Sequence, residues 1–144
     1  MAKETVYITK SSSQTQALGK GLAKSLYEGT VLAFFGNLGS GKTTFIQGLA
    51  QGLGIKRRII SPTFIILRQY KLKNGNFYHV DLYRTESYKD AEGVGLDQII
   101  HERRNIVAIE WAEKIRDFLP KKRTEIHINA IGEDKREIKI LNYG

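Results

Sequence analysis

The sequence predicts an α/β fold in which a central mixed sheet is flanked by helices and extended by antiparallel hairpins. Apolar runs within residues 30–35 and 105–109 have the composition of strands that are buried on both faces. Segments with helical spacing of apolar residues alternate with strands along the chain, as in α/β folds. The 144 residues show no linker, internal repeat or low-complexity tract. We therefore expect one domain over residues 1–144.

The first third of the chain predicts two strands and two helices. Residues 5–9 alternate apolar and polar side chains and predict an edge strand. Three leucines at helical spacing predict an amphipathic helix over residues 14–27, preceded by serine N-cap hydroxyls at residues 11–13. A buried strand over residues 30–35 leads into a glycine-rich loop at 36–41. Apolar side chains on one face then predict a helix over residues 42–53, with Gly54 as its stop.

The remaining chain predicts two hairpins around another buried strand. Residues 64–71 and 77–83 predict strands joined by a type I′ turn at Asn74-Gly75. Residues 88–102 predict a helix that is interrupted by Gly93 and Gly95. The strand over 105–109 is followed by a short helix over 112–118, which ends before Pro120. Alternating segments at 125–131 and 137–141 predict a closing antiparallel hairpin.

Composition and charge exclude several classes of protein. Hydrophobic residues make up 41% and charged residues 26%, as in ordinary globular proteins. The absence of cysteine excludes disulfide scaffolds, thiol catalysis and cysteine-ligated metals. No apolar run approaches the ~20 residues of a membrane helix, and no apolar signal core opens the chain, so we expect a cytoplasmic protein and no membrane. The net charge of +8 favours a polyanionic or acidic partner.

A phosphate-binding motif, G-x-x-x-x-G-K-[ST], occupies residues 36–43. It follows a predicted buried strand and opens a predicted helix, which is the context in which this motif forms a P-loop. Its glycines permit unusual backbone angles, so that successive N–H groups form an anion nest. Lys42 is suited to the β- and γ-phosphates and Thr43 to Mg²⁺. The sequence therefore predicts nucleoside triphosphate binding in a P-loop NTPase fold, against the alternative of a plain glycine-rich turn.

Two acidic residues end predicted strands, where a hydrolase needs carboxylates for its metal and attacking water. Glu110 follows the better buried strand and resembles a Walker B acid, with a surface acid as the alternative. Asp81 ends another strand, with a structural ion pair to Arg84 as the alternative. The sequence lacks the N-K-x-D motif of GTPases, the L-S-G-G-Q signature of ABC proteins and an obvious kinase lid. Residues 90–93 match D-x-x-G but follow a polar stretch, which indicates a chance match.

Several segments together resemble the TsaE (YjeE) family, bacterial P-loop ATPases of tRNA threonylcarbamoyladenosine synthesis. They are the phosphate loop at residues 36–45, Ser-Pro-Thr-Phe at 61–64, His-Val-Asp-Leu-Tyr-Arg at 79–84, and Ile-Glu-Trp at 109–111 followed by Leu-Pro at 119–120. Each element is weak alone, but their order and spacing match across about residues 12–128. The resemblance implies a P-loop fold, ATP and Mg²⁺ as cofactors, and hydrolysis of ATP.

The resemblance also assigns site residues. It implies that ATP binds at Gly39, Ser40, Gly41, Lys42, Thr43 and Thr44. Thr43, Asp81 and Glu110 are the implied Mg²⁺ ligands, with either acid able to direct the metal or the water. Thr63, in the Ser61-Pro62-Thr63 element, resembles a switch residue that senses the γ-phosphate through its hydroxyl. The alternative for that element is ordinary turn chemistry.

The resemblance also implies nucleotide contacts for residues outside these motif positions. The family places a tryptophan near the nucleotide at the position of Trp111, for which packing is the alternative. Ser12, Ser13 and Thr15 lie where the family's N-terminal segment approaches the adenine, with helix capping as the alternative. Arg136 resembles a basic residue of the last hairpin that touches the nucleotide. Asn37 departs from the family, because many members have an acidic residue there.

The three histidines predict no metal site. His79 is interpreted as a strand residue, and His101 and His127 are isolated, so zinc is not expected. Basic clusters at residues 56–58, 103–104 and 121–123 suit tRNA phosphates. A solvated surface is the default for these clusters, because no recognised RNA-binding module accompanies them.

The resemblance implies partners as well as an activity. TsaB and TsaD are the implied partner proteins, and TsaD transfers threonylcarbamoyl to adenosine 37 of tRNA. ATP hydrolysis by this chain would reset the TsaB–TsaD complex between turnovers, with weak activity alone because no arginine finger is evident in cis. tRNA would be reached through the complex, and no DNA partner is expected. A small metabolite kinase and an ATP-gated binding module remain as alternatives.

Overall fold

The computed structural model describes residues 2–26, 28–37, 39–57, 59, 67–85 and 88–144. Its strands are β1 (Ala2–Thr9), β2 (Val31–Phe35), β3 (Leu67–Leu72), β4 (Gly75–Asp81), β5 (Asn105–Glu110), β6 (Arg123–Ala130) and β7 (Arg136–Tyr143). Its helices are α1 (Ser12–Ala23), α2 (Lys42–Gly52), α3 (Tyr88–Glu92), α4 (Leu96–His101) and the 3₁₀ helix η1 (Ala112–Phe118). The predicted order of strands and helices is confirmed. No helix in these ranges has the length and apolarity needed to cross a membrane.

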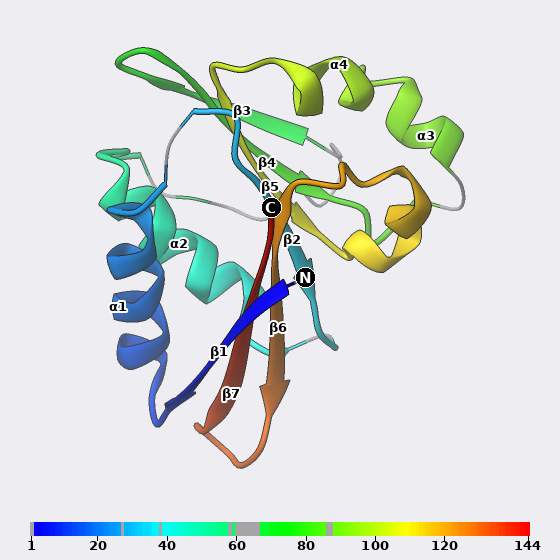
Figure 1. Cartoon of the computed structure of the whole chain (residues 1–144). Coiled ribbons are helices and arrows are strands. Elements are labelled where there is room, and N and C mark those ends of the chain that lie inside the picture. Colours follow the sequence, from blue (N-terminus) through cyan, green and yellow to red (C-terminus); the bar gives the residue numbers. More distant parts are fainter. Residues whose placement is uncertain (1, 27, 38, 58, 60–66, 86–87) are drawn as a thin grey trace.

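The strands form one mixed, seven-stranded sheet in the order β1-β7-β6-β2-β5-β4-β3 (Figure 1). The central strands β6, β2, β5 and β4 run parallel to one another. The outer pairs β1–β7, β7–β6 and β4–β3 are antiparallel. The prediction of a mixed sheet with added hairpins is therefore confirmed, and the carboxyl ends of β2, β4 and β5 share one edge of the sheet.

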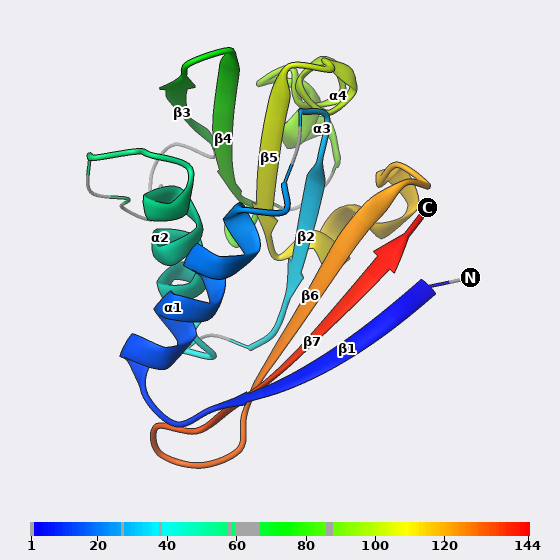
Figure 2. The ribbon, with the colours of Figure 1, turned by 60° about the vertical axis from the view of Figure 1, so that its left-hand side comes forward.

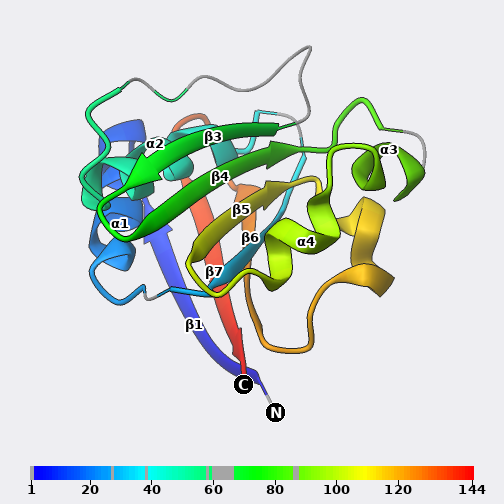
Figure 3. The same cartoon turned by 90° about the horizontal axis from the view of Figure 1, so that it is seen from above.

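Helices cover both faces of the central strands (Figures 2 and 3). On one face α1 and α2 pack over a core that includes Leu32 and Phe34 of β2. On the other face α3, α4 and η1 pack over a core that includes Val31, Ala33 and Phe35 of the same strand. All residues of β2 and β5 are buried, as their continuous apolar runs predict.

One hairpin turn and one helix differ from the prediction. The prediction of a type I′ turn at Asn74-Gly75 is wrong. Leu72 pairs with Gly75, so Lys73 and Asn74 form the turn. Neither residue has the positive φ that a type I′ turn requires. Gly75 belongs to β4, where a Cβ would lie 1.9 Å from the carbonyl oxygen of Arg104. The predicted helix over 88–102 is divided into α3 and α4, because Gly95 adopts a left-handed φ of 74°.

Glycines allow α1 and α2 to approach each other closely. A Cβ at Gly48 of α2 would lie 1.9 Å from the Gln16 carbonyl oxygen, and one at Gly19 of α1 would lie 2.2 Å from the Phe45 carbonyl oxygen. Backbone atoms cannot rotate away as side chains do, so a larger residue would force the helices apart. The packing of α1 against α2 therefore fixes the helix that begins at the phosphate loop.

This packing predicts opposite effects for two glycine-to-alanine changes. Gly48→Ala should lower the free energy of unfolding by about 1–3 kcal/mol, the usual cost of overpacking. Gly21→Ala in α1, where a Cβ meets nothing within 4 Å, should raise it by about 0.5–1 kcal/mol. Urea unfolding measures both values. Equal effects of the two changes would contradict the close approach of the helices.

Candidate functional site

The glycine-rich loop joins the carboxyl end of β2 to the N-terminus of α2. Gly39 and Gly41 have φ values of 79° and 106°, in the left-handed region that favours glycine. Gly41 is the N-cap of α2 and has no side chain to accept from the first-turn N–H groups, and that turn contains no acidic residue. These N–H groups and the positive end of the helix dipole therefore suit an external anion.

Lys42 is held at the loop without burying an unpaired charge. Its side chain is buried, Nζ donates to the carbonyl oxygen of Gly36 at 2.6 Å, and Nζ lies 3.6 Å from the centre of the Trp111 ring. Burial lowers the pKa of Lys42, while the charges of Glu110, Glu113 and Asp81 oppose that shift. The ammonium group is therefore oriented at the mouth of the loop by a carbonyl and a π face.

Trp111 has a backbone conformation that is unusual for its residue type. Its φ of 60° makes it the one non-glycine residue with positive φ in the described part of the chain. This conformation costs about 1–2 kcal/mol and turns the chain sharply after Glu110. The indole ring packs against the core below α3 and η1, over Lys42 Nζ, and 5.2 Å from the Tyr83 ring. The Trp111 ring therefore both packs against the core and contacts Lys42.

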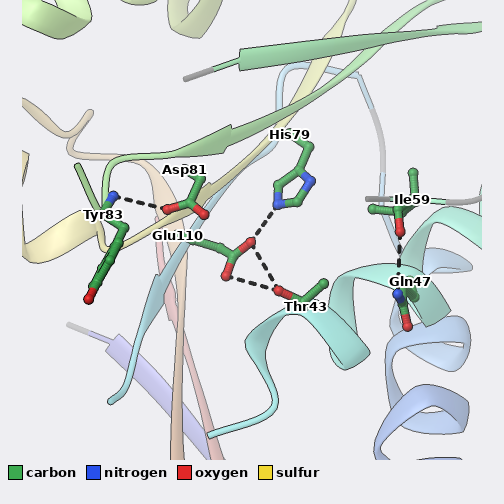
Figure 4. A network of polar contacts seen from close by, with 7 residues as sticks. All are labelled: Thr43, Gln47, Ile59, His79, Asp81, Tyr83 and Glu110. Carbon is green, nitrogen blue, oxygen red and sulfur yellow. Dashed lines mark hydrogen bonds and ion pairs between the residues drawn. The ribbon is translucent and has the colours of Figure 1, made fainter. Parts of the chain in front are cut away.

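The two predicted acids emerge side by side at the sheet edge (Figure 4). Asp81 of β4 pairs in register with Glu110 of β5. The Thr43 hydroxyl lies 3.3 and 3.4 Å from the two carboxylate oxygens of Glu110, which is 3% exposed. Asp81 Oδ1 accepts a hydrogen bond of 2.9 Å from the Tyr83 amide. The structure therefore brings together Thr43, Asp81 and Glu110, although they are distant in sequence.

His79 is a site residue that the sequence analysis missed. It is fully buried, and its Nε2 lies 2.5 Å from Glu110 Oε2. The interpretation as a strand residue is correct, but it omits this contact. One signal was available: His79 precedes Asp81 by two residues, so alternation along a strand puts both side chains on the same face.

Arg136 connects the last hairpin to the phosphate loop. Its Nε donates to the Ser40 carbonyl oxygen at 2.8 Å, and Nη2 donates to that of Gly39 at 3.4 Å. Nη1 donates to carbonyl oxygens of the β6–β7 turn at Gly132, Glu133 and Lys135. The guanidinium group therefore binds the outer side of the loop, with the N–H side left to an anion.

The start of α1 also lies beside the loop. Thr15 is buried, its hydroxyl lies 2.7 Å from that of Thr9, and its methyl group approaches Gly41. Ser11 is the N-cap, since its hydroxyl accepts from the Gln14 amide at 3.1 Å. Ser12 is exposed in the first turn, so it does not provide that cap. Thr63 lies outside the described residues.

The basic clusters differ in their local partners. Arg123 is paired with Glu125 at 2.6 Å, which makes it part of a folded-state network. Arg104 lies 3.5 Å from Glu102 in an exposed pair, and Lys56 and Arg57 are exposed. The surface interpretation and direct tRNA contact both remain predictions for these side chains.

The contacts of Arg136 predict that it holds the loop's shape. Arg136→Ala should remove donors to the Ser40 and Gly39 carbonyls and lower the free energy of unfolding by about 1–2 kcal/mol. Amide hydrogen exchange of residues 36–44 should become faster. Lys139→Ala on the same strand is the control, because its ion pair with Glu137 is long at 3.9 Å. Unchanged exchange in the arginine variant would refute the bracing role.

Comparison with known proteins identifies the family of this chain. A family model described as "Threonylcarbamoyl adenosine biosynthesis protein TsaE" matches residues 9–138. A protein from Bacillus subtilis (strain 168) that is named tRNA threonylcarbamoyladenosine biosynthesis protein TsaE is 39% identical, over 99% of this chain and 88% of its own length. A protein of the same name from Treponema pallidum (strain Nichols) is 34% identical, over 92% of this chain and 97% of its own length. The crystal structure of Bacillus subtilis YdiB superposes with a TM-score of 0.84 at 36% identity, covering 100% of this chain and 88% of that one. The chain therefore belongs to the TsaE family.

Proposed function

We propose that this chain is a Mg²⁺-dependent P-loop ATPase of tRNA threonylcarbamoyladenosine biosynthesis. The observation that carries the proposal is the meeting, at one sheet edge, of the glycine loop, Lys42, Thr43 and the Glu110 carboxylate. The names of the relatives support the pathway. The order β2, glycine loop, α2, with β5 beside β2, supports a P-loop NTPase fold.

Different residues of the site contact different parts of the triphosphate. Amides of the loop and the Lys42 ammonium bind the β- and γ-phosphate oxygens, as in other P-loops. For Lys42 this replaces contacts with a neutral carbonyl oxygen and a π face by an ion pair with an anionic phosphate oxygen. Ser12, Trp111 and Arg136 lie on elements beside the loop and stay candidates for contacts outside the phosphates.

A magnesium ion fits the donors that the site offers. The Thr43 hydroxyl and the Glu110 and Asp81 carboxylates are hard oxygen ligands. In the described ranges no cluster of three or more acidic or histidine side chains forms a complete protein cage. Magnesium needs no such cage, because it usually takes one or two protein ligands together with phosphate oxygens and water. When bound, it would neutralise charge on the phosphates.

Hydrolysis requires a carboxylate to orient water and cations to stabilise developing charge. We assign the orientation of the water to whichever of Asp81 and Glu110 does not contact the metal directly. Arg136 already donates to five carbonyl oxygens, so it is not offered as an arginine finger. We infer that the TsaB–TsaD complex completes the site and that hydrolysis resets this complex between modification cycles.

Two variants should separate nucleotide binding from hydrolysis. Lys42→Ala should abolish measurable ATP binding, because it removes the cation from the loop. Glu110→Gln should retain ATP binding but lower the hydrolysis rate by about a hundredfold or more, as expected when a metal or water ligand loses its charge. Calorimetry and phosphate release measure the two quantities. Asp117→Asn, at an exposed position of η1, is the control. Normal hydrolysis by the Glu110 variant would refute its assigned role.

A reconstituted reaction tests the pathway. ATP hydrolysis and tRNA modification are followed together, with and without TsaB and TsaD, and stimulated hydrolysis with many modification cycles is expected. Phosphoryl transfer to a small acceptor would instead indicate a kinase. Full multiple-turnover modification by a Glu110→Gln protein that binds but does not hydrolyse ATP would indicate an ATP-gated binding module.

A further inference from the structure

We propose that His79 is a positioning residue that holds the Glu110 carboxylate beside Thr43 through an Nε2–H donor. The inference rests on the proposed function and adds a residue to the same site. It goes beyond the acids, the loop and the lysine, since His79 is argued to act only through Glu110. Figure 4 shows the three side chains converging.

Strand alternation puts the imidazole on the side of the sheet where the loop helix lies. Phe77 of β4 packs in the core beneath α1 and α2. Residues 79 and 81 follow it at the strand period, so His79 and Asp81 share that face. In β5, Ala108 lies in the same core and Glu110 follows by two residues. The two side chains therefore meet across a parallel strand pair, below the first turn of α2.

The hydrogen-bonding pattern selects one form of the imidazole. An ionised carboxylate only accepts hydrogen bonds, so Nε2 must carry the proton that it donates to Glu110 Oε2 at 2.5 Å. Nδ1 is buried and has no partner among the described residues. A proton on Nε2 leaves a lone pair at Nδ1, whereas an N–H at Nδ1 would be a buried donor without an acceptor in the described part of the chain.

The surroundings make this single contact important for the orientation of Glu110. The carboxylate is 3% exposed, and the Thr43 hydroxyl is 3.3–3.4 Å from it, so His79 provides the shorter hydrogen bond. Fixing Oε2 on the imidazole sets the orientation of the carboxylate, so that both of its oxygens lie near the Thr43 hydroxyl. Second contacts of this kind orient metal-ligating side chains in many proteins. An apolar residue would fill the space beside Glu110 but would let its carboxylate rotate.

Two substitutions of similar volume distinguish the effect of the His79 N–H donor from the effect of its packing. His79→Gln keeps an N–H at a comparable reach, whereas His79→Leu removes it. The main measurement is ADP binding by calorimetry with MgCl₂ and with EDTA. We expect the affinity gained from Mg²⁺ to fall about ten- to a hundredfold in His79→Leu and to stay near the parent value in His79→Gln. Affinity in EDTA should be unchanged in both variants. His101→Gln, at an exposed position of α4, controls for loss of a histidine.

Hydrolysis and spectroscopy provide independent readouts. The Mg²⁺ concentration for half-maximal ATP hydrolysis should rise in His79→Leu and recover in His79→Gln. In the unmodified protein, long-range ¹H–¹⁵N spectra should show the Nε2–H tautomer of His79, and this readout serves even if the leucine variant fails to fold. An Nδ1–H tautomer, an unchanged Mg²⁺-dependent gain in folded His79→Leu, or an equal loss in both variants would overturn the inference. If the unmodified protein binds Mg²⁺ and ADP but never hydrolyses ATP, even with partners, the proposed function fails and the role of His79 still stands.

Discussion

The parallel pairing of β2, β4 and β5 is the constraint on which the rest of the site depends. Parallel strands bring their carboxyl ends to one edge, so the loop after β2 and the acids at the ends of β4 and β5 become neighbours. A shift of one residue between β4 and β5 would turn an acid toward α3 and α4, because side chains alternate between faces. β4 and β5 pack against a core on each face of the sheet, and this packing fixes their register. The core therefore determines which side chains meet at the carboxyl edge of the sheet.

The loop itself is held from three directions. α2 continues from the loop and is pressed against α1 through Gly19 and Gly48. Arg136 binds the outward carbonyl groups of the loop from the β6–β7 hairpin. On the inner side, Lys42 is fixed by Gly36 and the Trp111 ring. Each of these contacts is made between groups of the protein itself, and together they restrict the conformation of the loop.

The sequence predicted well the features that follow from local patterns and a motif. The buried strands, the loop and the acids at strand ends depend on residues close together in the chain, and each is found where expected. The prediction of the turn beside Gly75 was wrong, because the place of that glycine depends on its close approach to the backbone carbonyl of Arg104, 29 positions away. The contact of His79 with Glu110 and the bracing by Arg136 were not predicted, because both join side chains to partners from other strands or loops. Such contacts depend on register and rotamer, which periodicity does not contain.

The two buried carboxylates of the sheet, Glu110 and Glu125, differ in what surrounds them. Glu125 in β6 is bound by Arg123 and His127. Burial raises its pKa, but these hydrogen bonds and charges outweigh burial and hold the pKa below 4.5. Its charge is therefore neutralised within the fold. Glu110 contacts a histidine and a threonine hydroxyl, neither of which carries a permanent charge. Among the residues that the structure describes, no arginine or lysine is in direct contact with Glu110, so this carboxylate retains attraction for a cation. It lies at the edge of the sheet where the glycine-rich loop opens.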